Sequence, residues 1–588
     1  MGSDAKHGND KTKNHREFKM NLKTTFFAVS YLLAFSQWCY AESNLNSLIK
    51  SQALPAVVAG ESPPLRDIPQ TFTEQNQTAS HIVPLQRRKL SPQVRLPKAL
   101  SVTDPLIALQ KSTQLIISSP LSSFDGLSGL DDKAVFGQVY TPTDVNGDVG
   151  MNHYVQMVNS LYQVFDKKTG LALTPPSKLS KVFAAAGNTG VCATNDEGDP
   201  IVLYDAITHR WLLSQFNFKF SSAPYHECIA ISKTEDPTGG YYVYDFLIPN
   251  NNMGDYPKFG VWQDGYYMTA EQYSDLTGFV GEAVLVFDRA KMLAGLPAAT
   301  NYHDLSALTN LSVLLPADLD GTPPPVGTPN YVIGFNHPNS ASLDLTRKMR
   351  IFEVKADFST ANATGSILEK PSLTVAAFNP MNCSNPAGYC IPQPNTLKKL
   401  DALADRPMNR LQYRYFKNHC PLTGTLAGCG SLVFNHTVRG ANAGESAVRW
   451  YMLKQNLATK AIGMAQQGTF APDNNSRWVG SAALNKRGDL AIGYSISSKT
   501  VYPSIHYAGR LVTDPKNILS ITGVLQNGNG AQLNAPPQRW GDYTMMSVDP
   551  VDDCTFWYTN QYYNDNIEGQ ALHWHTRIGS FKLSDLCL

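Results

Sequence analysis

A repeated pattern of turn and strand constrains the fold of this chain most strongly. Each copy has an acidic or arginine-bearing turn, a strand of apolar and aromatic residues, a short turn and a second strand. A less clear copy covers NYVIGFNHP and RKMRIFEVKADF, and the clear copies begin at Gly147, Gly198, Asp255, Asp405, Arg477 and Arg539. The spacings between starts are about 50 to 90 residues, which is a length typical of propeller blades once their loops are included.

The repeat predicts an all-β fold, a six- or seven-bladed β-propeller. Radial repetition protects strand edges that would otherwise pair with other chains. Charged residues make up only 16% of the chain and aromatic residues 10%, which favours strands over long solvated helices. We expect the C-terminal HWHTRIGSFKL to close the ring by pairing with an early blade. A large β-sandwich is the structural alternative.

The N-terminus predicts export. Lys23 precedes the apolar run TTFFAVSYLLAF, and CYA at 39–41 offers small residues before Glu42, so residues 1–41 resemble a signal peptide, with Met20 as an alternative start. Lipidation of Cys39 is the alternative use of this segment. Residues 42–130 are rich in Pro, Ser and Gln and are predicted to form a linker or arm before a propeller at 131–588. No apolar run is long enough for a membrane span, so we expect a secreted protein, extracellular or periplasmic.

The cysteines fit an oxidising compartment. Removing Cys39 from the nine cysteines leaves an even number, which favours disulfides over thiolate metal sites because no CxxC pair is present. Proximity in the sequence predicts four pairs: Cys192 with Cys228, Cys383 with Cys390, Cys420 with Cys429, and Cys554 with Cys587.

The repeats also predict a binding site. The innermost strand of each blade begins at the rim of the central channel, so residues just before it converge there. Gly541 permits a tight turn beside this rim. The alternative is that the aspartates only cap turns. The predicted ligand-binding residues are Asp148, Asp199, Tyr256, Asp405, Arg406, Arg477, Trp478, Arg539 and Trp540.

Several long motifs carry a resemblance. GDVGMNHYVQMVN, DPIVLYDAITHRWLLSQF, DYPKFGVWQDGYYMT, FDRAKMLAG and RWGDYTMMSVDPVDDCTFWYTNQYY resemble those of a family of secreted bacterial proteins of unassigned activity, over about residues 135 to 585. SVDPVDDCTFW resembles more loosely the Asp-box of sialidase-like propellers, through Ser547, Asp549, Thr555 and Trp557. The distance from Asp549 to Thr555 is longer than the corresponding distance in an Asp-box, and the glycine of the Asp-box is missing.

Three functions remain open. Mixed carboxylates, arginines and aromatic rings around an opening suit an extracellular glycan or a protein partner. A sialidase-like glycoside hydrolase would use the arginines for a substrate carboxylate, with Tyr543 or Tyr256 as nucleophile and Asp255 or Asp542 as proton carrier. The third is a structural cell-surface protein. With a net charge of +1, nucleic acid is not an expected partner.

Calcium is the only cofactor that the motifs suggest. DVNGDVG places oxygen ligands at Asp144, Asn146 and Asp148, as in the first half of a calcium loop, but Val149 and Val155 stand where such a loop has glycine and a bidentate glutamate. An Asx-rich turn is the alternative. We also expect Asp318 and Asp320 in DLDGTPPP to form a turn.

Overall fold

The structure is a computed structural model, in which the described residues belong to one compact unit, Ile49–Leu588. The described residues are 49–69, 80–82, 103–111, 115–117, 119–219, 222–275, 277–308, 311, 313–336, 348–360, 364–381, 389–404, 406–442, 444–533, 539–565 and 574–587. The predicted signal peptide, Cys383 and Asp405 lie outside them. Among these residues, no helix has the length and apolar character needed to cross a membrane.

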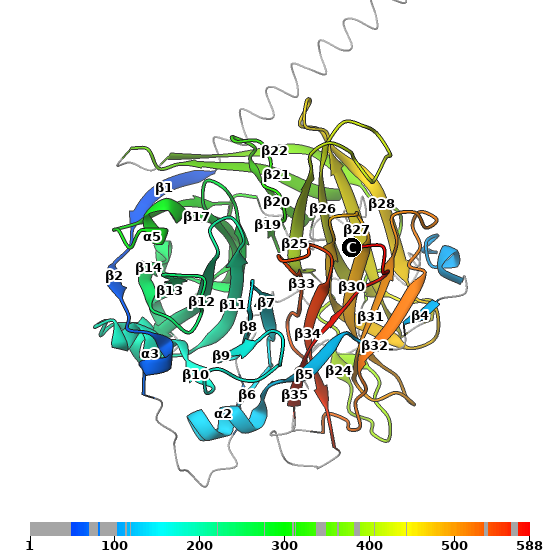
Figure 1. The fold of residues 1–588 in the computed structure, drawn as a ribbon, viewed down its shortest axis with the longest axis horizontal. Helices are drawn as coiled ribbons and strands as arrows, with labels where there is room; N and C mark the ends of the chain where they lie inside the picture. Colours follow the sequence, from blue (N-terminus) through cyan, green and yellow to red (C-terminus); the bar gives the residue numbers. More distant parts are fainter. Residues whose placement is uncertain are drawn as a thin grey trace, which may run out of the picture. The chain divides into compact units, whose positions relative to one another are not determined.

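Successive strands pair antiparallel in units of four, and several of the sheets contain further strands (Figure 1). The first three units are β7 (Asn146–Val149), β8 (His153–Val158), β9 (Leu161–Asp166) and β10 (Ser177–Lys178); β11 (Gly198–Asp205), β12 (Arg210–Lys219), β13 (Ser222–Ser232) and β14 (Tyr241–Leu247); and β15 (Asn252–Val261), β16 (Tyr266–Ser274), β17 (Gly278–Phe287) and β18 (Ala299–Asp304).

The fourth and fifth units join into one sheet of eight strands, because β19 and β25 pair in parallel. They contain β19 (Leu315–Asp320), β20 (Asn330–Phe335), β21 (Lys348–Asp357) and β22 (Thr364–Thr374), then β25 (Pro407–Phe416), β26 (Cys429–Arg439), β27 (Ser446–Gln455) and β28 (Ile462–Phe470).

The sixth unit holds β29 (Ser476–Leu484), β30 (Leu490–Ser497), β31 (Ser504–Arg510) and β32 (Ile521–Gln526). The last has β33 (Met545–Val548), β34 (Phe556–Tyr563) and β35 (Trp574–Phe581). Its fourth strand is β5 (Ser122–Ser128), which pairs antiparallel with β35 although it precedes the first unit in the chain (Figure 1). The C-terminal segment was expected to pair with an early blade. It closes the ring instead by pairing with β5, a strand inside the predicted arm.

The innermost strands show that the units form a ring. β7, β11, β15, β19, β25, β29 and β33 each contact the next in this order, and β33 contacts β7. Gly260 lets β15 approach β19, because a Cβ at this residue would lie 2.3 Å from the backbone oxygen of Ala317. The predicted all-β propeller is confirmed, and the described strand order is consistent with the larger of the two expected blade numbers.

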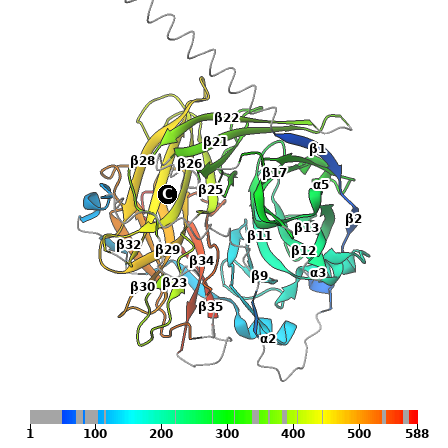
Figure 2. The ribbon, with the colours of Figure 1, turned by 180° about the vertical axis from the view of Figure 1, so that it is seen from behind.

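Parts of the N-terminal arm extend the outer edges of the blades. β1 (Lys50–Pro55) pairs with β18, β2 (Val58–Glu61) with β14, and β4 (Leu115–Ile117) with β32. Figure 2 shows β1 and β2 beside the green blades. The described parts of the arm thus add strands to the propeller instead of preceding it, because outer strands offer unpaired backbone groups.

The other elements are short and lie in the N-terminal arm, between blades or between strands of one blade. They are β3 (Ser80–Ile82) paired with β6 (Val139–Thr141), β23 (Tyr389–Ile391) paired with β24 (Leu400–Asp401), the helices α2 (Gly129–Phe136), α3 (Leu179–Ala185), α4 (Val191–Thr194) and α5 (Arg289–Leu293), and the 3-10 turns η1 (Leu65–Asp67), η3 (Ala108–Lys111) and η4 (Pro249–Asn251). Ser128 and Asp131 form a capping box that starts α2 directly after β5.

The apolar core lies between neighbouring sheets. Val155 and Val164 of the first unit pack with Val202 and Leu213 of the second in one cluster of buried side chains. Successive side chains of a strand point to opposite faces of its sheet. Both faces carry apolar residues, because a blade is covered by a neighbour on each side.

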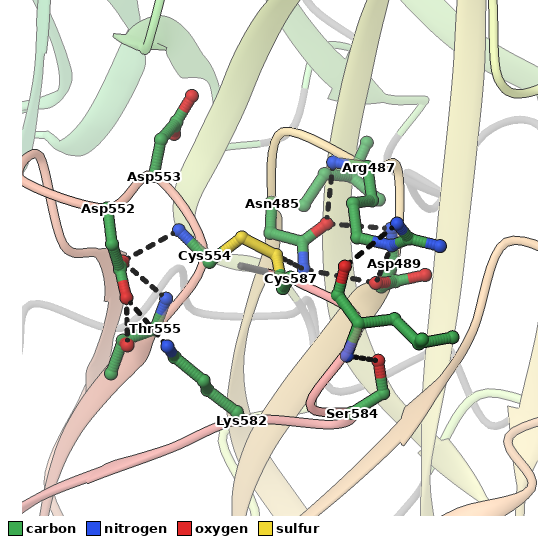
Figure 3. Close-up of a disulfide and its surroundings, with 12 residues drawn as sticks. Asn485, Arg487, Asp489, Asp552, Asp553, Cys554, Thr555, Lys582, Ser584 and Cys587 are labelled. Carbon is green, nitrogen blue, oxygen red and sulfur yellow. Dashed lines mark hydrogen bonds and ion pairs between the residues drawn. A yellow bond between two sulfur atoms is a disulfide. The ribbon is translucent and has the colours of Figure 1, made fainter.

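Three predicted disulfides are confirmed: Cys192–Cys228, Cys420–Cys429 and Cys554–Cys587. Figure 3 shows the last, which joins the turn between β33 and β34 to the end of the chain, with Asn485 donating to Cys587 Sγ at 3.5 Å. The pairing of Cys383 with Cys390 stays a prediction, because Cys383 lies outside the described residues. The three bonds fit an oxidising environment.

Candidate functional site: a buried charged cluster

Irregular pairing near the start of several inner strands builds the site. The ladder shifts between Gly198 and Ile201 in β11, between Asp255 and Lys258 in β15, and between Trp478 and Ser481 in β29. A bulge of this kind bends the strand and re-aims its side chains. The repeated charged motifs were expected to be turns before the strands, but several lie at bulges within them.

Left-handed backbone accompanies these bulges. Asp199 has φ 47°, Tyr256 φ 53° and Val479 φ 47°. For non-glycine residues this conformation is uncommon, and for β-branched Val479 it is strained. Three inner strands therefore accept backbone strain at related positions.

Charged groups of five units meet in what we call the central cluster. It contains Asp144, Asp199, Asp255, Glu271, Asp542, Lys258, Arg406, Arg539, Tyr256 and Tyr543, and none of them is more than 5% exposed. Five carboxyl groups face three basic groups in this set. The predicted opening is therefore wrong in one respect, because these side chains are enclosed and do not stand on an exposed rim.

Arg539 and Asp542 anchor one side of the central cluster. Nη2 of Arg539 donates to both carboxylate oxygens of Asp542, at 2.5 and 2.6 Å. The backbone N–H of Asp542 donates to Oδ1 of Asp144 at 2.7 Å, and Nδ2 of Asn159 donates to Oδ2 of Asp144 at 2.7 Å. These bonds tie the last unit to the first.

Aromatic rings and basic groups form the other side. Nζ of Lys258 lies 3.5 Å from the ring centroid of Tyr256 and 3.9 Å from that of Tyr543. Cζ of Arg406 lies 4.6 Å from the Tyr256 centroid, while its Nη1 donates to Glu271 Oε2 at 3.2 Å. The attraction between a cation and the face of an aromatic ring is stronger inside a protein than at an exposed site.

Burial controls the protonation of the central cluster. It raises the pKa of Asp144 well above its ordinary value, and the nearby Asp542 carboxylate raises it further. Burial likewise raises the pKa of Asp255, with Asp199 adding to the effect. The pKa of Lys258 falls to about 8, because burial disfavours the ammonium more than the surrounding carboxylates favour it. Carboxyl groups with a raised pKa and a lysine with a pKa of about 8 can donate and accept protons near neutral pH.

A second charged group, which the sequence did not predict, lies on neighbouring inner strands. Arg410 of β25 pairs with Asp318 and Asp320 of β19. These two aspartates were expected in a turn, but they end the innermost strand of the fourth unit. Asp148 is near this group, and burial raises its pKa to about 7 despite the Arg410 charge.

Lys258 and Arg410 were also missed as functional candidates. Lys258 lies two positions after the selected Tyr256, and Arg410 lies four positions after the selected Arg406. Basic residues inside otherwise strand-like segments were the available signal.

The predicted ligand-binding residues therefore separate into groups. Asp199, Tyr256, Arg406 and Arg539 meet in the central cluster, whereas Arg477 pairs with Asp473 through bonds of 2.8 Å. Asp148 lies with Arg410, and Asp405 is outside the described residues. Trp478 and Trp540 pack against one another with ring centroids 5.5 Å apart.

The predicted catalytic residues Asp255, Asp542 and Tyr543 do meet in the central cluster. Tyr543 is a poor nucleophile there, since its hydroxyl donates to the backbone oxygen of Pro200 at 3.0 Å. Burial, reinforced by nearby carboxylates, raises its pKa well above the usual range, the opposite of activation.

The calcium candidates have other bonds. Asp144 accepts as described above, Asn146 donates to Pro200 O at 2.7 Å, and Asp148 accepts from the N–H of Tyr204 at 2.7 Å. In the part of the chain that the structure describes, no group of three or more His, Cys, Asp or Glu residues is placed to hold a metal ion. The arrangement favours strand-to-strand bonding over calcium ligation.

The Asp-box-like segment forms a structural turn between β33 and β34. Oδ2 of Asp549 accepts from the indole N–H of Trp557 at 3.0 Å, and the N–H of Asp549 donates to Thr555 O at 2.8 Å. Lys167 of the first unit pairs with Asp549 at 3.0 Å. The turn stabilises the closure of the ring and is not part of the central cluster.

Comparison with known proteins identifies no family. No family model matches the chain, and no curated protein matches it. Similar solved structures include an endo-arabinase from Bacteroides thetaiotaomicron, at 10% identity and TM-score 0.26, with 54% of this chain and 95% of that chain covered. The WD40 domain of SCAP from fission yeast has 9% identity and TM-score 0.32, covering 75% and 96%. A subtype N10 neuraminidase-like protein of A/little yellow-shouldered bat/Guatemala/060/2010 has 8% identity and TM-score 0.31, covering 62% of this chain and 93% of that chain. At these values the similarities carry no argument about the site, and the resemblance to a secreted bacterial family stays a prediction.

Proposed function

We propose that the protein is an exported recognition propeller that binds an extracellular glycan or protein at the central cluster. One observation carries the proposal: strained inner-strand bulges bring carboxyl groups, basic groups and tyrosines together in a buried cluster. Burying this many ionisable groups costs free energy, and strain of this kind is concentrated at functional sites. Hydroxyl groups of a glycan suit such a mixture of donors, acceptors and ring faces.

Because the cluster is enclosed, a ligand would reach it only by displacing covering residues. Binding would then replace internal hydrogen bonds with bonds to the ligand. We favour recognition over turnover because the hydroxyl of Tyr543 is bonded to Pro200 O. The central cluster therefore has no activated tyrosine nucleophile of the sialidase kind.

A glycan-array screen of the purified exported chain tests the proposal. Wild-type protein should bind a restricted set of glycans, and Tyr256→Phe, which removes the hydroxyl bonded to Asp542 O at 3.3 Å, should weaken that binding without unfolding. Lys168→Gln, a change at an exposed lysine in the turn after β9, is the control. Silence on glycan and protein arrays would reject recognition and favour the structural cell-surface alternative.

Glycoside hydrolysis is the second candidate, and one observation favours it. Burial keeps the Asp255 carboxyl protonated to higher pH, while Arg539 bonds both oxygens of Asp542. Two carboxyl groups in different environments are the pattern of an acid and a base or nucleophile. Release of product from chromogenic glycosides, lost in folded Asp255→Asn, would establish an enzyme; binding without product would reject it.

A further inference from the structure

A separate pocket lies between the segment that joins β23 to β24 and the turn after β30. Its volume is 270 Å³, and its lining includes Pro392, Gln393, Asn395, Leu397, Lys399 and Lys499. The first five follow β23, whereas Lys499 is in the turn after β30. The pocket thus lies between segments that are distant in the sequence.

Hydrogen bonds hold the two walls in place. Oγ of Ser497 donates to Pro392 O at 2.8 Å, and Nδ2 of Asn395 donates to the Tyr502 hydroxyl at 3.1 Å. The floor is fixed as well, since Gln393 is 2% exposed and its Oε1 accepts from the N–H of Gln532 at 2.7 Å. A pocket with fixed walls loses little conformational entropy when a ligand binds.

The charge of the pocket has one sign. Lys399 and Lys499 line the pocket from its two segments, and the lining contains no acidic residue. Among the described residues, neither lysine forms an ion pair or a side-chain hydrogen bond. The protein as a whole is nearly neutral, so this pairing of unpartnered lysines is a local feature.

We propose that this pocket binds a sulfate or phosphate ester carried on a single sugar ring. Lysine ammoniums are compact charges with three donors each, which suits a tetrahedral anion, whereas planar carboxylates are matched better by arginine. Pro392 and the 98% exposed Leu397 offer apolar contact to a ring face. The volume lies just below the usual range of ligand pockets and suits one ring-sized group. This site is independent of the central cluster and of its proposed function.

Calorimetry on the full exported chain at low salt tests the proposal with three probes. N-acetylglucosamine 6-sulfate should bind saturably, inorganic sulfate more weakly, and N-acetylglucosamine not measurably. Lys399→Gln and Lys499→Gln should each weaken binding of the sulfated sugar by about tenfold, as loss of one charge-assisted contact predicts. Lys168→Gln should leave it unchanged.

Lysine acetylation gives a readout that does not depend on variants. The sulfated sugar should slow acetylation of Lys399 and Lys499 but not of Lys168, measured by peptide mass spectrometry. Absence of saturable binding, or binding by both glutamine variants that equals the binding by wild-type protein, would overturn the site. Equal affinity for inorganic sulfate would overturn the sugar part of the proposal, and equal affinity for the neutral sugar would overturn the anionic part.

Discussion

Arg539 and Asp542 form a buried ion pair three residues apart, in which one guanidinium nitrogen bonds both carboxylate oxygens. Arg539 is 5% exposed and Asp542 2%. The pair belongs to the turn before β33 and reaches Asp144 of the first unit through the N–H of Asp542. It therefore lies where the ring closes, and its loss affects both the central cluster and the closure.

Breaking this pair from one side should destabilise the protein strongly. Arg539→Met leaves a buried carboxylate without its partner, and we expect a loss of about 3 to 5 kcal/mol in the free energy of unfolding. The double variant Arg539→Met/Asp542→Leu should lose less than the single one, measured by chemical denaturation. Arg66→Met, at an exposed ion pair with Asp236, is the control, expected to cost under about 1 kcal/mol. Equal losses in the single and double variants would contradict the interpretation.

Asp148 should make stability depend on pH. Its pKa in the folded protein is about 7 against an ordinary value of 3.8, so between these pH values the folded state keeps a proton that the unfolded state has released. The contribution of this group is fully present below the ordinary value and is lost as pH rises through the folded pKa.

Asp148→Asn removes this titration, so the stability of wild type relative to the variant should fall between pH 4 and pH 7 by a few kcal/mol, on the order that linkage predicts. Denaturation at a series of pH values measures the difference. Asp585→Asn, at an exposed carboxyl near the C-terminus, should show no such trend. A difference between wild type and Asp148→Asn that is constant with pH would show that Asp148 is ionised when folded.

The disulfides should differ in their effect on stability. Cys554–Cys587 closes a sequence separation of 33 residues and Cys420–Cys429 one of 9. Loop entropy predicts losses of about 4 kcal/mol for Cys554→Ala/Cys587→Ala and about 3 kcal/mol for Cys420→Ala/Cys429→Ala. Unfolding of both double variants without reductant gives the order, and the reverse order would show that local packing outweighs loop length.

Gln156 should hold the last blade to the first. Its Oε1 accepts from the N–H of Leu127 at 2.7 Å, and its Nε2 donates to Thr559 at 2.7 Å. Gln156→Leu leaves a buried N–H of β5 without an acceptor, and we expect a loss of about 2 kcal/mol. Hydrogen exchange should accelerate in β5 before other strands.

The control for this prediction is Gln526→Leu. Among the described residues the side chain of Gln526 bonds only the neighbouring Asn527 O, so the change should alter stability by less than about 0.5 kcal/mol. Uniform acceleration of exchange over all blades in Gln156→Leu would mean that β5 is not released locally.

The sequence by itself determined the fold class, the repeat and three disulfide pairs, because each depends on local patterns or short separations. The partner of the C-terminal strand, β5 of the arm, was decided by the tertiary structure. Strand periodicity and turn residues are encoded within a few positions, so they can be recognised without knowing what packs against them.

The tertiary structure decided the character of the site. The motif around Asp255 was recognised, but whether its carboxylate faces solvent or the interior depends on bulges in several strands and on partners from five units. Arg410 acquires Asp318 and Asp320 as partners only when β25 pairs in parallel with β19. Contacts between residues far apart in the chain set burial, and burial sets the pKa values, so the exposed rim predicted from sequence became an enclosed charged cluster.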